Sequence, residues 1–174
     1  MIPKPYLLFL GDAPDQLSAK VAQGIKDWRP ENAVGQIRMS GCNADLGLED
    51  LTLEQAYEKG ARTMVIGVAN RGGYISEAWK TVLIEALSTG FDLASGLHNL
   101  LRDEPDLVAN AKQYGRLLHD VRVPTVEYPI ANGKNRTGKR CLAVGTDCSA
   151  GKMYTAMAID KLMQDRGMKS TFRA

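Results

Sequence analysis

Cysteine and histidine are scarce in this chain of 174 residues, which contains three cysteines and two histidines. Cys42, Cys141 and Cys148 form no CxxC pair, and any disulfide scheme leaves one of them unpaired. This usage suits a reducing compartment, so we expect a cytoplasmic protein. Because His98 and His119 lie in different segments, the sequence predicts no metal site.

Long apolar runs and an excess of one charge are equally lacking. The longest apolar runs, Tyr6–Leu10 and Met64–Val68, fall well below the ~20 residues that cross a bilayer. The N-terminus lacks the layout of a signal peptide. With 22 Lys and Arg against 20 Asp and Glu, the net charge of +2 is too balanced for a dedicated nucleic-acid or membrane-surface binder. We therefore expect a soluble globular protein that acts on neither nucleic acid nor membranes.

Short apolar runs alternate with helical patterns over the first 130 residues. The runs are typical of buried strands and comprise Tyr6–Leu10, Val34–Met39, Thr63–Val68, Phe91–Ser95 and Arg122–Tyr128. Apolar residues at helical spacing predict helices between them, over residues 15–28, 51–57, 76–89 and 105–118. Strands separated by helices of this length predict an α/β fold with a parallel sheet covered on both faces.

The composition changes after residue 130. Residues 131–139 contain almost no apolar side chains and are interpreted as a linker between domain 1–130 and domain 140–174. The second domain should comprise a strand at Arg140–Val144, a glycine-bounded loop, a helix at Lys152–Asp165 and a strand from Lys169 to Ala174. Since ~35 residues do not close a core of their own, we expect this domain to be completed by a longer chain or a partner.

The strongest motif is a phosphate-binding loop between the predicted strand and helix of the second domain. It matches G-x-x-x-x-G-K and consists of Gly145, Thr146, Asp147, Cys148, Ser149, Ala150, Gly151 and Lys152, followed by Met153. The glycines let successive backbone N–H groups converge on an anion, and the helix N-terminus and Lys152 add positive charge. The alternative is a glycine-rich turn beside a surface lysine.

Met153 departs from the motif of nucleotide hydrolases, which place Ser or Thr there to hold Mg²⁺. A thioether does not coordinate this hard cation, and Thr155 points about 200° around the helix. A phosphate-bearing ligand that is not cleaved at phosphorus, such as coenzyme A, fits the loop better than a hydrolysed nucleotide.

A second group of candidates follows the predicted strands of the first domain. Asn70, Arg71, Gly72 and Gly73 come directly after the strand at Thr63–Val68. Arg71 suits a substrate carboxylate, although a plain turn with a solvated arginine is an equal alternative. The turns at Gly11–Asp12, Ser40–Cys42 and Ser95–His98 follow other strands, so all four should line one rim of the sheet.

His98 is the one histidine on this rim, and its ordinary pKa near 6.5 makes it a candidate general base. A lone histidine is more often a capping or packing residue. Cys148 lies inside the phosphate loop, where we expect a structural role rather than nucleophilic catalysis.

Three segments together resemble a specific family: Gly145–Lys152 (GTDCSAGK), Gly67–Gly73 (GVANRGG) and Ser95–His98 (SGLH). With them, the whole chain is similar to the amino-terminal half of the DgcN-type proteins, long grouped as a domain of unknown function and including D-glutamate N-acetyltransferases. The resemblance implies a Rossmann-like domain, a linker and the start of a P-loop domain that family members continue beyond residue 174.

The same resemblance implies an activity. An acetyl group would pass from acetyl-CoA to the amino group of D-glutamate, or of a similar amino acid, with residues 145–153 holding cofactor phosphates. The resemblance is also compatible with a homo-oligomer. Other family members are known only as ATP- or GTP-binding proteins, so two alternatives stay open. These are an ATP-dependent ligase or kinase, and a non-catalytic nucleotide-responsive module that docks a partner.

Overall fold

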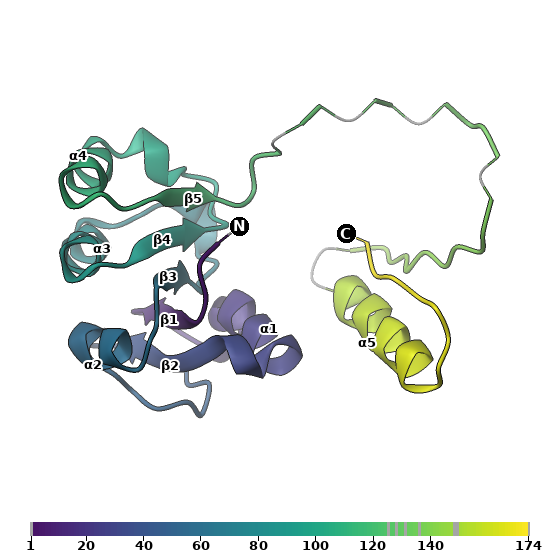
Figure 1. Cartoon of the computed structure of the whole chain (residues 1–174), viewed down its shortest axis with the longest axis horizontal. Coiled ribbons are helices and arrows are strands. Elements are labelled where there is room, and N and C mark those ends of the chain that lie inside the picture. The colour runs from purple at the N-terminus through teal and green to yellow at the C-terminus, as the bar shows by residue number, and fades with distance from the viewer. Residues whose placement is uncertain are drawn as a thin grey trace. The chain divides into compact units, whose positions relative to one another are not determined.

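The computed structural model describes residues 2–124, 126–127, 129–130, 132–135, 137–147 and 150–173, without the side chain of Arg71. The chain separates into two compact units, Met1–Glu127 and Tyr128–Ala174. Within the described ranges, the first unit carries a five-stranded sheet with its helices, and the second carries one α-helix (Figure 1). None of the helices in these ranges is both long and apolar enough to cross a membrane.

The sheet of the first unit is parallel throughout and has the strand order β2-β1-β3-β4-β5. Its strands are β1 (Tyr6–Gly11), β2 (Ala33–Arg38), β3 (Thr63–Ile66), β4 (Asp92–Ser95) and β5 (Leu118–Asp120). Because β1 and β3 are both paired on two sides, their side chains form the centre of the core. Leu7, Leu8, Phe9 and Leu10 are all 0% exposed.

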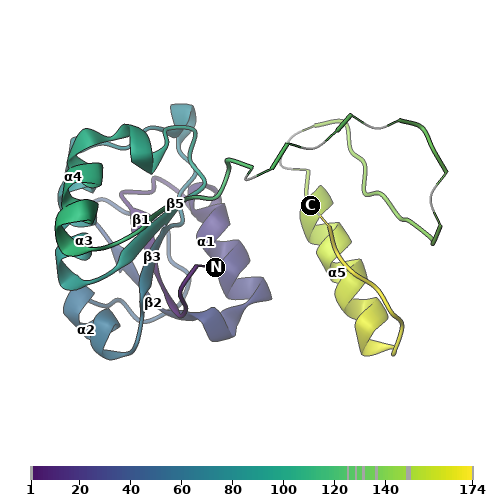
Figure 2. The ribbon, with the colours of Figure 1, turned by 45° about the horizontal axis from the view of Figure 1, so that its top comes forward.

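Helices cover both faces of this sheet. One face carries α2 (Leu53–Glu58), α3 (Glu77–Thr89) and α4 (Pro105–Tyr114), and the other carries α1 (Lys20–Trp28), as Figures 1 and 2 show from two directions. A short 3₁₀ turn, η1 (Gln16–Ala19), leads into α1. The predicted α/β fold, a parallel sheet flanked by helices, is therefore confirmed.

Capping residues define the ends of α3, which lies within the predicted range 76–89. The Ser76 side chain accepts a hydrogen bond from the backbone N–H of Trp79 at 3.2 Å, which satisfies one free donor of the first turn. Gly90 ends the helix in the left-handed conformation, with φ of 113°, where a residue without Cβ is favoured. Pro105 likewise occupies the first turn of α4.

The last strand of the first unit was predicted at the wrong place. The expected helix over 105–118 ends at Tyr114, because Gly115 adopts the left-handed conformation and its N–H bonds back to Ala111. The chain then runs directly into β5, which replaces the strand expected at Arg122–Tyr128. Among the described residues of that range, Val123 closes a turn onto Asp120 instead.

The outer side of β2 is bordered by the segment 49–51. The Gln36 N–H donates to the Glu49 carbonyl, and the Leu51 N–H donates to the Gln36 carbonyl, both at 2.9 Å. The Gln36 side chain is fully buried and donates to Asp45 at 2.8 Å while accepting from the Leu46 N–H at 2.8 Å. This network attaches the 39–52 segment to the sheet.

The second unit contains the predicted helix, α5 (Lys152–Asp165), in which no residue is buried. The strands expected at 140–144 and from Lys169 onward are absent from the described residues of these ranges. A strand needs a hydrogen-bonding neighbour, and none of the described residues of this unit supplies one. Leu142 and Val144, which were predicted to lie in a strand, are accordingly 82% and 79% exposed.

Candidate functional site

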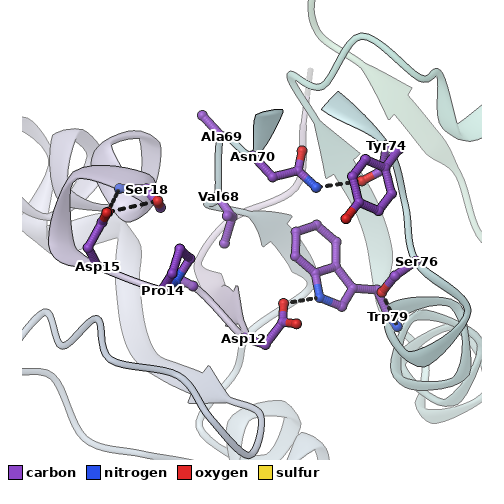
Figure 3. Close-up of a pocket in the computed structure, with 11 residues that line it drawn as sticks. Asp12, Pro14, Asp15, Ser18, Val68, Ala69, Asn70, Tyr74, Ser76 and Trp79 are labelled. Atoms are coloured by element: carbon purple, nitrogen blue, oxygen red, sulfur yellow. Dashed lines mark hydrogen bonds between the residues drawn. The ribbon is translucent and has the colours of Figure 1, made fainter. Parts of the chain in front are cut away.

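The strand order creates a switch point at the carboxyl ends of β1 and β3. From β1 the chain crosses to β2 on one side of the sheet, and later strands are added on the other side, beginning with β3. The connections on the two sides diverge, and ligands of open α/β sheets bind in the crevice left there. A cavity of about 580 Å³ lies at this place in the first unit (Figure 3).

The floor of the cavity is built around Trp79 of α3. Its indole Nε1–H donates to the Asp12 carboxylate at 2.8 Å, and its ring meets Phe9 edge to face at a centroid distance of 5.4 Å (Figure 3). A Cβ at Gly11 would stand 2.8 Å from the indole, and Gly11 has a φ of 53°. Glycine at the end of β1 therefore lets Trp79 approach and places Asp12 at the cavity.

A second carboxylate reaches the cavity from the start of η1. Asp15 accepts hydrogen bonds from the N–H and hydroxyl of Ser18, each at 2.8 Å. These bonds, first of all the one from the hydroxyl, lower the pKa of Asp15 below its ordinary value. Asp15 is therefore ionised at neutral pH, and it lines the cavity together with Asp12.

The turn after β3 also borders the cavity. The Asn70 amide donates to the Tyr74 carbonyl at 2.8 Å, and both residues line the cavity. The Asn70 Oδ1 atom is buried and has no hydrogen-bond partner among the described residues. Such an unmet buried acceptor is uncommon in folded proteins.

Gly72 and Gly73 bring the candidate turn against the loop that carries His98. Both glycines have positive φ values, 82° and 63°. A Cβ at Gly73 would stand 2.8 Å from the backbone nitrogen of His98, and the Asn99 N–H donates to the Gly73 carbonyl at 3.0 Å. The structure thus places Asn70–Gly73 and His98 side by side.

His98 has a partner that the sequence analysis missed. The Arg122 Nη1 atom lies 3.1 Å from Nδ1 and 2.9 Å from Nε2 of the exposed imidazole. Arg122 was predicted to begin a strand, whereas it follows β5. Its position just beyond the carboxyl end of a strand is the signal that would have identified it.

Several cavity residues were also missed because each has a structural role visible in the sequence. Ser76 and Trp79 were predicted only as parts of the helix over 76–89, yet both line the cavity. The turn at Ser40–Cys42, expected on the same rim, lies beside this cavity and borders a smaller one at the end of β2. Met39 connects the end of β2 to the end of β1, since its N–H donates to the Gly11 carbonyl at 2.8 Å.

The phosphate-loop candidates lie in the second unit. The Lys152 ammonium donates to the Asp147 carbonyl, and its aliphatic stem lies 3.3 Å from where a Gly145 Cβ would stand. Gly151 precedes α5 in the left-handed conformation, and none of the described side chains caps this helix start. Lys152 is therefore folded over the loop, at a helix N-terminus that attracts anions. Cys148 and Ser149 lie outside the described residues.

In the described parts of the two units, no three His, Cys, Asp or Glu side chains gather closely enough to hold a metal ion.

Two family models match the chain. Residues 37–124 match the domain of unknown function DUF1611_N, described as a Rossmann-like domain, and residues 129–174 match DUF1611_C, described as a P-loop domain. A crystal structure of a DUF1611 family protein from Anabaena variabilis is similar, with a TM-score of 0.78 and 29% identity. The match covers 95% of this chain and 51% of that one.

Curated relatives agree with these matches. A D-glutamate N-acetyltransferase of Tritonibacter scottomollicae is 72% identical over the whole chain, and one of a Pseudoalteromonas species is 42% identical over 99% of it. The chain spans about half of each relative, 52% in both cases. By these matches the chain belongs to the DUF1611 family, with a Rossmann-like domain followed by a P-loop domain.

Proposed function

We propose that this chain is part of an N-acetyltransferase that moves an acetyl group from acetyl-CoA to the amino group of D-glutamate. The observation that carries the proposal is the match to two curated D-glutamate N-acetyltransferases, one of them 72% identical over every residue of this chain. The partner is then a small molecule, and no nucleic acid or membrane takes part.

The phosphate loop is the proposed cofactor site. Backbone N–H groups of residues 145–151 and the Lys152 ammonium would hold the pyrophosphate or 3′-phosphate of CoA. Met153, which is 53% exposed, follows Lys152 in place of the hydroxyl residue that holds Mg²⁺ in nucleotide hydrolases. A cofactor whose phosphorus atoms stay intact does not need that ligand.

The proposed reaction is a direct transfer. The amine nitrogen of the acceptor attacks the thioester carbonyl, a C–N bond forms, and the C–S bond breaks to release CoA as the thiol. Before the attack the ammonium gives one proton to a base, which accelerates such reactions ~10²–10⁴-fold. Backbone N–H groups of a glycine-rich turn suit the transient oxyanion.

His98 is the proposed base, and Asn70–Gly73 the proposed substrate-binding turn. The contact of Gly73 with His98 supports the pairing, because it holds the imidazole beside the turn. We assign the Arg71 guanidinium to a substrate carboxylate, which it suits through two parallel hydrogen bonds. The Arg122 Nη1 atom, 2.9 Å from Nε2, is the neighbouring donor that the substrate would displace from the lone pair of the imidazole.

Ligand titration tests the cofactor assignment. We expect CoA and acetyl-CoA to bind the protein by calorimetry without Mg²⁺, and Lys152→Ala to raise the KM for acetyl-CoA roughly tenfold or more, because a charge-assisted hydrogen bond is lost. Lys161→Ala, which removes an exposed lysine from the same helix, is the matched control. Mg²⁺-dependent ATP binding without any response to CoA would contradict the proposal and point to a ligase or kinase.

A pH profile tests the base. We expect His98→Ala to lower kcat by about 10²-fold or more, and to remove the acidic limb of the kcat profile, because proton transfer from the amine loses its acceptor. Rates are measured with D-glutamate at saturating acetyl-CoA from pH 5 to 9. Nearly full kcat across this range would eliminate the role of His98.

A further inference from the structure

We infer that the cavity at the carboxyl ends of β1 and β3 binds a protonated amine, with the Asp12 carboxylate as its counter-ion. Resting on the proposed function, this inference places the ammonium group of the acceptor substrate at Asp12 in the first unit, before its proton passes to the base. It adds a binding residue that the sequence analysis did not assign to any ligand.

The charge of the cavity is the first argument. Two carboxylates, Asp12 and Asp15, line it, and none of the described lining side chains is a lysine or arginine. Neither carboxylate forms a salt bridge within the described residues. Carboxylates repel phosphates, although phosphates are the usual ligands at the switch point of such sheets. A positively charged group is therefore the occupant that the cavity favours.

The fixed position of Asp12 is the second argument. Trp79 is 3% exposed, and its indole N–H holds one oxygen of the Asp12 carboxylate at 2.8 Å. A carboxylate that is held before the ligand arrives loses little side-chain entropy on binding. In Figure 3 Asp12 lies at the foot of the cavity, with Asp15 and Pro14 on one side and the Trp79 ring on the other.

The aromatic lining is the third argument. Trp79 and Tyr74 both line the cavity, and Tyr74 is 55% exposed, so its ring is accessible to a ligand. Aromatic faces attract cations through their quadrupole. Carboxylates beside aromatic rings, in a cavity of about 580 Å³, suit an ammonium group on a small organic molecule.

The Trp79 indole provides a direct measurement. Its N–H signal in ¹H–¹⁵N spectra of the protein should shift when a ligand reaches Asp12, whereas the signal of Trp28, which does not line the cavity, serves as the reference. Trp28→Phe assigns the two signals. The probes are D-glutamate and glutarate, which share two carboxylates and differ in the amine. We expect D-glutamate to shift the Trp79 signal and glutarate to leave it unchanged.

Substitution of Asp12 completes the test. Asp12→Asn preserves an acceptor for Trp79 and removes the charge, so we expect D-glutamate affinity to fall about 10- to 100-fold with acetyl-CoA affinity unchanged. Glu58→Gln, which removes an exposed carboxylate from α2, is the matched control. Thermal unfolding verifies that the variants fold. Asp15→Asn tests the other carboxylate that lines the same cavity.

The outcomes separate this inference from the proposed function. Equal shifts with glutarate and D-glutamate, undiminished D-glutamate binding by Asp12→Asn, or no Trp79 shift with any probe would each overturn the amine site, whatever the acetylation assay shows. A Trp79 shift that requires both the amine and Asp12, in a protein without acetyltransferase activity, would support the site and refute the function.

Discussion

At the scale of the residue, Gly67 shows how closely α1 approaches the sheet. Its carbonyl accepts a hydrogen bond from the Ala22 N–H at 3.0 Å. A Cβ at Gly67 would stand 2.3 Å from the Ala22 Cβ, which no unstrained contact allows. The absent side chain therefore fixes the distance between helix and strand at the point where β3 opens into the cavity-lining turn.

Gly67→Ala should destabilise the protein by about 1–3 kcal/mol, because overpacking forces α1 away from β3. Urea unfolding, monitored by circular dichroism, measures this loss of stability. Gly96→Ala is the control, since a Cβ there meets only Val121 at an ordinary 3.7 Å. Equal stability of the two variants would mean that α1 adjusts without cost.

At the scale of the element, an ion-pair network joins β2 to the segment that follows it. Arg38 donates to Asp50 through two nitrogens, one of them at 2.8 Å, and Gln36 donates to the same carboxylate at 3.1 Å. The bonds from Arg38, and then that from Gln36, lower the pKa of Asp50 below its ordinary value of 3.8. Asp50 therefore stabilises the folded state when it is ionised.

This network predicts a pH dependence. Because the folded-state pKa is lowered, the contribution of Asp50 is complete above its ordinary value and is lost as the pH falls through the lowered one. We expect Asp50→Asn to reduce Tm at pH 7 and the difference from the unsubstituted protein to narrow below about pH 4. Scanning calorimetry from pH 7 to 2.5 measures this difference in Tm, with Glu85→Gln, which removes an exposed carboxylate from the middle of α3, as the control. A constant difference would show that the carboxylate contributes no charge interaction.

Local signals in the sequence predicted most elements and part of the candidate site. Ser76 and Gly90 mark α3 because capping depends on neighbouring backbone groups alone. The strand at Leu118–Asp120 was missed because three residues carry too short a pattern, and pairing with β4 decides it. Asp12 was expected on the rim, but its bond to Trp79 joins residues 67 positions apart, which no local pattern reveals.

At the scale of the whole molecule, alternating strands and helices predicted a parallel sheet but left the order of its strands open. The order β2-β1-β3-β4-β5 follows from the crossover between β2 and β3, and it determines which loops meet. For this reason the turns after β1 and β3 share a cavity, whereas the turn after β2 borders another one.

The two outermost strands have a consequence for behaviour at high concentration. Segment 49–51 occupies backbone groups of Gln36 along β2, and β5 offers only three residues before the chain turns toward Pro124. Unpaired strand margins recruit other chains into intermolecular ladders, and short or covered margins oppose this. The Rossmann-like unit is thus protected at both margins against the strand-to-strand aggregation to which open sheets are prone.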